Sequence, residues 1–223
     1  MNIALFIPDF NGGGAERAAI SIVESWSADS AHRPFLIARA NSGAYSEKAL
    51  ALGARVLGVP RSGLIATART PGKLARVLSE LRVSVVVAFL SGPSIILAKR
   101  WSSDLRVVWS VQNPLGSGST STGVVAAAHS LLIKRQMRWF LRQLDGIIAP
   151  SAGLVPSLRR AGWSGPVGIV VNPLSICPPN GGGPRTPEDG RKVRIVAAGR
   201  LVRQKRFDVL LRAVGRLSER VDS

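Results

Sequence analysis

The sequence predicts an α/β fold, with a doubly wound parallel β-sheet that carries helices on both faces. Short apolar runs recur along the chain, and stretches with helical periodicity lie between them. The runs are apolar at successive positions, which is typical of parallel strands buried between two helix layers. With 223 residues, of which 46% are hydrophobic and 19% charged, the chain can bury a sizeable core. This alternation indicates a Rossmann-like sheet.

Seven strands are expected in the first 171 residues. They span residues 3–8, 34–39, 55–59, 84–89, 106–111, 146–149 and 167–171. The clearest helical pattern between them is PGKLARVLSELR, residues 71–82, whose apolar side chains recur at i, i+3, i+4 and i+7. Pro71 suits the first turn of that helix, because proline lacks a backbone N–H that the first turn leaves unused.

The chain divides into two domains joined by a linker. Residues 1–175 hold the predicted sheet, and residues 176–192 are rich in proline and glycine and read as the linker. A new strand is expected at 193–199, followed by a basic turn and a helix with an apolar stripe from Phe207 to Leu217. One strand and one helix cannot bury a core. Residues 193–223 are therefore expected to be the start of a second domain that is cut short.

The charge is strongly positive, with 30 Lys and Arg against 13 Asp and Glu, a net charge of +17. Such a surplus favours anionic partners: nucleic acid, phosphorylated small molecules or acidic lipids. An ordinary basic surface explains it equally well. Nucleic acid is disfavoured, since neither a recognition-helix motif nor stacking aromatics in basic loops are evident.

The residue types that bind metals are scarce. The chain has one cysteine, Cys177, and two histidines, His32 and His129, that are far apart in sequence, and it contains no D-x-D pair. We therefore expect no metal site and no disulfide.

No segment suggests a membrane span or a signal peptide. The longest apolar neighbourhood is interrupted at residues 91–93, and the N-terminus lacks a basic stretch before its apolar run. We expect a cytoplasmic protein, with peripheral contact to a membrane as one interpretation.

The stretch AAHSLLIKRQMRWFLRQL provides the basis for that contact. It combines Lys134, Arg135, Arg138 and Arg142 with Leu131, Leu132, Trp139, Phe140 and Leu141. Basic and aromatic patterning of this kind can dock on anionic lipids. A plain crossover helix with solvated arginines fits the same pattern.

Three consecutive glycines, Gly12, Gly13 and Gly14, separate the first strand from a helix. A glycine-rich turn at a helix N-terminus directs unpaired N–H groups toward one point and lets an anion approach closely. The spacing is not G-x-G-x-x-G, and no G-K-[ST] follows, so a dinucleotide or P-loop site is disfavoured. A merely flexible turn remains the alternative. Glu16, in the first helical turn, complements the helix dipole and is a further candidate for substrate contact.

A second candidate site lies in AAGRLVRQKRFD. Gly199 follows the predicted strand, and Arg200 and Lys205 flank a turn that enters a helix. Two cations near a helix N-terminus suit a diphosphate, because arginine binds oxygens in a bidentate fork and lysine adds a point charge.

Three motifs together resemble family 4 of the retaining glycosyltransferases. They are FIPDFNGGGAER near the start, GIIAPSAGLVPSL with VGIVVNPL in the middle, and VAAGRLVRQKRFDVLLRA near the end. The last is the most specific, and the GGGAER variant resembles bacterial members that build lipopolysaccharide and capsule. The resemblance implies a GT-B fold: two Rossmann-like domains, with the acceptor on the first and the nucleotide-sugar on the second. It also implies a metal-independent reaction without a cofactor.

By this resemblance, Arg200 and Lys205 bind the donor diphosphate, with Gly199 beside them, and stabilise the departing nucleotide. The glycine loop borders the same cleft from the acceptor domain. Two departures stand out. The family's E-x7-E pair would fall beyond residue 223, and a histidine that many relatives place after a mid-domain strand is replaced by the stretch containing Gln112 and Asn113. An amide can hydrogen-bond a sugar hydroxyl but cannot act as a general base.

The function that these patterns favour is transfer of a hexose from a nucleotide-diphosphate sugar to a surface-glycan or polyprenyl-linked acceptor. The alternative is a non-catalytic, truncated acceptor-binding domain, either a broken gene product or a fragment that needs a partner chain. A nucleotide-dependent oxidoreductase is disfavoured because G-x-G-x-x-G is absent.

Overall fold

The computed structural model describes residues 1–26, 34–60, 64–90, 92–100, 104–113, 115, 135–173, 195–199 and 205–221. The chain forms two compact units, Met1–Cys177 and Pro178–Ser223. Each unit is treated separately below.

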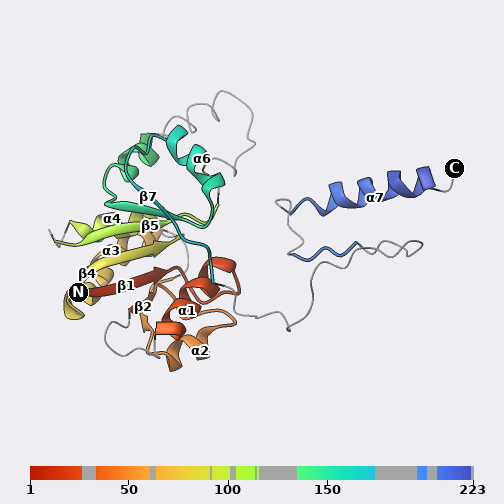
Figure 1. Ribbon diagram of the computed structural model, residues 1–223. Helices are drawn as coiled ribbons and strands as arrows, with labels where there is room; N and C mark the ends of the chain where they lie inside the picture. The colour runs from red at the N-terminus through yellow and green to blue at the C-terminus, as the bar shows by residue number, and fades with distance from the viewer. Residues whose placement is uncertain are drawn as a thin grey trace. The chain divides into compact units, whose positions relative to one another are not determined.

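The first unit is built on one sheet of seven parallel strands, in the order β3-β2-β1-β4-β5-β6-β7 (Figure 1). The strands are β1 (Asn2–Ile7), β2 (Phe35–Ala38), β3 (Arg55–Val56), β4 (Val83–Phe89), β5 (Arg106–Ser110), β6 (Gly146–Ala149) and β7 (Val167–Ile169). The order runs outward in both directions from β1 and β4, which is the doubly wound, Rossmann-like topology that the sequence predicts.

Helices connect the strands on both faces of the sheet. They are α1 (Gly14–Trp26), α2 (Ser46–Ala51), α3 (Leu64–Glu80), α4 (Gly92–Lys99), a helical segment at residues 135–141, a 3-10 turn η1 (Ala152–Leu154) and α6 (Val155–Arg160). Because parallel strands need crossovers, and crossovers are right-handed, each change in winding direction moves the helices to the opposite face.

Side chains of the central strands alternate between two buried clusters, one on each face. In β1, Ala4 and Phe6 belong to the buried cluster that includes residues of α3, α4 and α6, whereas Leu5 and Ile7 belong to the cluster that includes residues of α1 and α2. Alternate residues of a strand point to opposite faces, so a strand that is buried on both sides must be apolar throughout. This requirement explains the continuous apolar runs.

Two sequence-based expectations for the first unit are wrong in detail. Helix α3 begins at Leu64, so Pro71 lies inside it and not in its first turn. Pro71 is buried and leaves one turn of the helix without an N–H donor. Strand β3 has only two residues, where 55–59 were expected, although the Leu57 and Val59 N–H groups still donate to the Ala38 and Arg39 carbonyl oxygens at 2.9 and 3.1 Å.

The second unit contains α7 (Phe207–Val221), the helix that the apolar stripe predicts. The strand expected at 193–199 is not formed in its described part: residues 195–198 have no regular secondary structure. A strand is stabilised by hydrogen bonds to a neighbour, and the described residues of this unit include no other strand.

Candidate functional site

The candidate site of the first unit lies at the carboxyl edge of the sheet, where the winding direction reverses between β1 and β4. The loop after β1 leads to β2 on one side, and the loop after β4 leads to β5 on the other. Ligands of open α/β sheets bind in the crevice that forms at such a switch point. The loop after β1 carries the three consecutive glycines.

The glycine loop turns sharply into α1. The Gly13 N–H donates to the Asn11 carbonyl oxygen at 2.8 Å, and the Arg17 N–H donates to the Gly13 carbonyl at 3.1 Å, which opens the helix. Gly12 and Gly14 are exposed, and a Cβ atom added at either would meet no atom within 4 Å. The loop therefore leaves open space beside the N-terminus of α1, where a helix attracts anions.

Gly13 serves a different purpose from its neighbours. A Cβ atom at this position would overlap the carboxylate of Glu16, which folds back over the first turn of α1. Glu16 is buried, with 7% of its surface exposed. This position is the one that a carboxylate takes when it complements the positive end of a helix. The Glu16 carboxylate thus occupies the space beside Gly13 that a side chain at position 13 would need.

A second loop, between β2 and α2, anchors the glycine loop. The Phe10 N–H donates to the Ser42 carbonyl at 2.8 Å, and the Tyr45 N–H donates to the Phe10 carbonyl at 3.0 Å. Gly43 lies between these contacts with φ of +121°, and a Cβ atom there would overlap the Phe10 backbone. Only glycine fits this position, since both the φ angle and the close approach exclude a side chain.

Buried Asp9 completes the anchoring, because its Oδ1 atom accepts the Asn11 N–H at 3.0 Å. The sequence analysis identified neither Asp9 nor Gly43. The only sequence feature that pointed to Gly43 was its place as a glycine in the stretch NSGAY. That stretch does not show that Gly43 packs against the Phe10 backbone.

A chain of amide and hydroxyl hydrogen bonds crosses the same edge of the sheet farther along. The Asn172 Nδ2 group donates to Gln112 Oε1 at 2.8 Å, and the Gln112 Nε2 group donates to Ser110 Oγ at 2.8 Å. Ser110 ends β5, and Asn172 follows β7. Gln112, expected to contact substrate, therefore also ties two segments of the sheet edge together. Asn113, the second expected contact, is exposed beside it.

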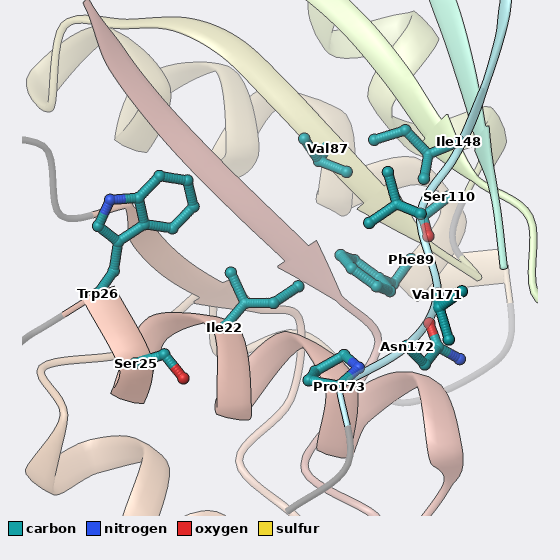
Figure 2. A pocket seen from close by; sticks show the side chains of 11 residues that line it. Ile22, Ser25, Trp26, Val87, Phe89, Ser110, Ile148, Val171, Asn172 and Pro173 are labelled. Carbon is teal, nitrogen blue, oxygen red and sulfur yellow. The ribbon is translucent and has the colours of Figure 1, made fainter.

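A pocket of about 550 Å³ opens on the sheet face that α1 partly covers (Figure 2). Its walls are mainly apolar: Ile22 and Trp26 from α1, Val87 and Phe89 from β4, Ile148 from β6, and the segment Val170, Val171 and Pro173. Ser25, Ser110 and Asn172 add polar groups. One end of the pocket thus reaches the hydrogen-bonded chain formed by Ser110, Gln112 and Asn172.

The second candidate site belongs to the other unit. A Cβ atom at Gly199 would lie 3.6 Å from Lys205 Cγ and 3.4 Å from Phe207 Cζ, so Gly199 and Lys205 are neighbours at the start of α7. Lys205 is exposed. Arg200, predicted to complete the cluster, lies outside the described residues. The structure brings together the glycine loop with Glu16, and Gly199 with Lys205, within their separate units.

A carboxylate in the first turn of α7 is stabilised by cations. Loss of hydration raises the pKa of Asp208, but Arg206 and Arg212 act in the opposite direction and hold this pKa below its usual value of 3.8. Arg212 contacts the carboxylate at 2.6 Å.

Among the described residues, no group of three or more His, Cys, Asp and Glu side chains could hold a metal ion. No helix in this part of the chain is long and apolar enough to cross a membrane. The absence of a metal site in the whole chain stays a prediction.

The parallel sheet, its winding order and the open glycine loop at the switch point define a Rossmann-like domain of the GT-B type. The model of Glycosyltransferase Family 4 matches residues 12–176 of the chain. The protein belongs to this family, as its motifs suggested. No curated protein matches the sequence.

Solved structures support the fold. HepE from Anabaena, solved in complex with UDP and glucose, has a TM-score of 0.55 at 15% identity, covering 78% of this chain and 45% of HepE. The lipopolysaccharide outer core galactosyltransferase WaaB in its apo form has a TM-score of 0.55 at 16% identity, covering 79% and 47%. UDP-GlcNAc 2-epimerase from Neisseria meningitidis reaches 0.50 at 13%, covering 76% and 45%. The chain thus spans less than half the length of these proteins, and the likeness concerns the fold alone.

Proposed function

We propose that the protein takes part in transferring a hexose from a nucleotide-diphosphate sugar to a surface-glycan or polyprenyl-linked acceptor, with retention of configuration and without a metal ion. The observation that carries this proposal is the open glycine loop at the switch point of a family 4 domain, where a Cβ atom at Gly12 or Gly14 would meet nothing within 4 Å. A lipid-linked acceptor would bring the protein to the cytoplasmic face of a membrane.

In this proposal the two units contribute different parts of the reaction. The glycine loop admits the sugar and its phosphate, because Gly12 and Gly14 carry no side chain that would fill the space. Gln112 and Asn113 hydrogen-bond hydroxyl groups of the substrate. Arg200 and Lys205, next to Gly199, bind the diphosphate and stabilise the negative charge that develops on the leaving nucleotide.

The alternative from the sequence is a domain that binds an acceptor without catalysing transfer. An epimerase reaction is supported only by similarity of fold, which does not by itself indicate function. The transferase proposal is also supported by the family match over residues 12–176.

The test is transfer of radiolabel from a panel of nucleotide-sugars, UDP-glucose, UDP-galactose and GDP-mannose, into lipid and glycan extracts of the source cells. We expect label transfer with at least one donor. Lys205→Ala and Arg200→Ala should lower the rate by about 10²-fold or more, since each removes a charge that stabilises the leaving group. Arg216→Ala, which removes an exposed cation farther along α7, is the matched control and should leave the rate unchanged.

Gly12→Val tests the first unit in the same assay. The added side chain meets no protein atom at its Cβ, so folding should be preserved while the open space is filled. Unchanged kinetics would assign the loop a purely structural role. Failure of every nucleotide-sugar in the panel, with acceptor binding retained, would overturn the transferase proposal in favour of the non-catalytic domain.

A further inference from the structure

The floor of the apolar pocket contains a single polar position among large apolar ones. Phe89 of β4 pairs with Ser110 of β5, and Ser110 pairs with Ile148 of β6, so these three side chains stand side by side on one face of the sheet. The next residue in this row is Gly168 of β7, which adds no side chain. Ser110 therefore interrupts the apolar row, although only 3% of its surface is exposed.

The hydrogen bonds at this position leave capacity for a further partner. Ser110 Oγ accepts the Gln112 Nε2–H at 2.8 Å, and Gln112 Oε1 accepts the Asn172 Nδ2–H at 2.8 Å. A hydroxyl group can accept and donate at the same time, and each side-chain amide has both donors and an acceptor. Among the described residues, no hydrogen bond uses the hydroxyl hydrogen of Ser110 or the Oδ1 atom of Asn172. The pocket thus offers a donor at Ser110 and an acceptor at Asn172.

The rest of the pocket is mainly apolar and carries no charge among the described residues that line it. Ser110 and Asn172 lie at the end away from Trp26 of α1 (Figure 2). Part of the apolar wall is open to solvent, since Val170 is 54% exposed and Trp26 is 39% exposed. A concave, largely apolar site with a few polar groups at one end is typical of a pocket that binds a small molecule.

These walls and polar groups restrict the chemistry of a ligand. A plain hydrocarbon chain would leave the buried Ser110 hydroxyl facing apolar atoms, and a buried donor without a partner costs free energy. An unsubstituted sugar ring would bury several hydroxyl groups against apolar walls, and a phosphate or carboxylate would be buried without a cation, both of which are unfavourable. An N-acyl group avoids these costs. Its amide matches the donor and the acceptor at the polar end, and its alkyl chain matches the walls.

We propose that this pocket binds the N-acyl group of an acylated amino sugar. The carbonyl oxygen of the ligand accepts from the Ser110 hydroxyl, the N–H of the ligand donates to Asn172 Oδ1, and the acyl chain extends along the sheet toward Ile22 and Trp26. The bond from Asn172 Nδ2 to Gln112 Oε1 keeps the oxygen of the Asn172 amide available to the ligand. The inference rests on the proposed function for the role of this sugar as a substrate, whereas the binding itself requires no transfer.

The test is isothermal titration calorimetry of the full chain with N-acetylglucosamine, N-butanoylglucosamine and N-hexanoylglucosamine. Binding should strengthen along this series by up to about fourfold for each added methylene group, as expected when a CH₂ group moves from water into an apolar site. The comparison ligand is 2-O-hexylglucose, which carries a chain of similar length at the same carbon but no amide. It should bind at least about fivefold more weakly than N-hexanoylglucosamine, because it leaves the polar end of the pocket without a partner.

Ser110→Ala examines the polar end separately from the walls. The variant loses the donor but keeps the apolar side chains, so its affinity for N-hexanoylglucosamine should fall about five- to tenfold while its affinity for 2-O-hexylglucose stays the same. The matched control is Ser157→Ala, which removes a buried hydroxyl group of α6 that donates to the Leu154 carbonyl at 2.8 Å, outside the pocket. This variant should bind both ligands as the original protein does.

Three results would overturn the proposal. Equal binding of N-hexanoylglucosamine and 2-O-hexylglucose would make the pocket a site for any hydrocarbon chain. Affinities that do not change with the length of the acyl chain would place that chain outside the pocket, and no binding of any of the four ligands would leave the apolar walls to a protein segment. Because no nucleotide-sugar is present in the titration, its outcome is independent of transfer, and chain-length-dependent binding without any transferase activity would reject the proposed function but not this site.

Discussion

The two units of the chain differ in what covers their apolar side chains. In Met1–Cys177, seven strands lie between helices, and the side chains of the central strands are buried on both faces. In Pro178–Ser223, α7 exposes the apolar stripe that predicted it: Leu211 is 72% exposed and Leu217 56%. The stripe is as regular as that of α3, whose Leu74 is fully buried. A helical pattern therefore specifies a helix, whereas burial requires a second layer.

The sharpest test of this contrast is a pair of Leu→Ala substitutions. Leu74→Ala removes a buried side chain from the contact of α3 with the sheet and should lower the free energy of unfolding by about 2–5 kcal/mol. Leu211→Ala removes an exposed side chain and should change it by less than about 0.5 kcal/mol. Urea denaturation monitored by circular dichroism measures both values. A loss at Leu211 comparable with that at Leu74 would mean that α7 has a packing partner in solution.

The second prediction concerns two glycines in the loops of the candidate site. One is enclosed by backbone atoms and the other lies in open space, a contrast like that between the two units. Gly43→Ala forces a side chain into a left-handed conformation and against the Phe10 backbone, and the strained φ alone should cost about 1–3 kcal/mol. Gly12→Ala adds the same methyl group in open space and should leave the stability within about 0.5 kcal/mol of the original. Thermal unfolding of both variants measures the difference. Equal stabilities of the two variants would show that the loop from β2 to α2 can accommodate a side chain at position 43 without a loss of folding free energy.

Most of the fold could be predicted from the sequence because its signals are local. Each strand of the sheet overlaps an apolar run, and α7 follows its stripe. The errors arose where tertiary context decided the outcome. Pro71 lies inside α3, and residues 195–198 form no strand because hydrogen-bonded pairing cannot be read from one segment.

The sequence named the glycine loop, Glu16 and Gln112 as parts of the candidate site, but not the contacts that hold them in place. Gly12 to Gly14 are recognisable in the sequence as three consecutive glycines. The sequence does not show that Gly13 differs from the other two, because the difference comes from the Glu16 carboxylate that folds over it. The bond between Asn172 and Gln112 joins residues that are 60 positions apart, and no periodicity indicates such a partner.

Arg135, Arg138 and Arg142 are exposed, whereas Phe140 and Leu141, which the sequence analysis grouped with them as a lipid-docking surface, are buried in the core. That part of the interpretation is wrong, because the sequence alone did not show which side chains face the sheet. Leu131, Leu132 and Lys134 lie outside the described residues.

The smallest expected effect comes from one substitution made in a helix of each unit. Gly72 in α3 and Gly215 in α7 are both exposed, and a Cβ atom at either meets nothing within 4 Å. Alanine is favoured over glycine inside a helix by about 0.8–1.0 kcal/mol. Gly72→Ala should therefore raise the free energy of unfolding of the first unit by up to about 1 kcal/mol. Gly215→Ala should increase helix content, seen by circular dichroism, without moving the main transition, because no described strand layer supports α7. If both variants shifted the main transition, α3 and α7 would unfold together as one cooperative structure. The two units would then differ in how far their apolar side chains are buried, but not in stability.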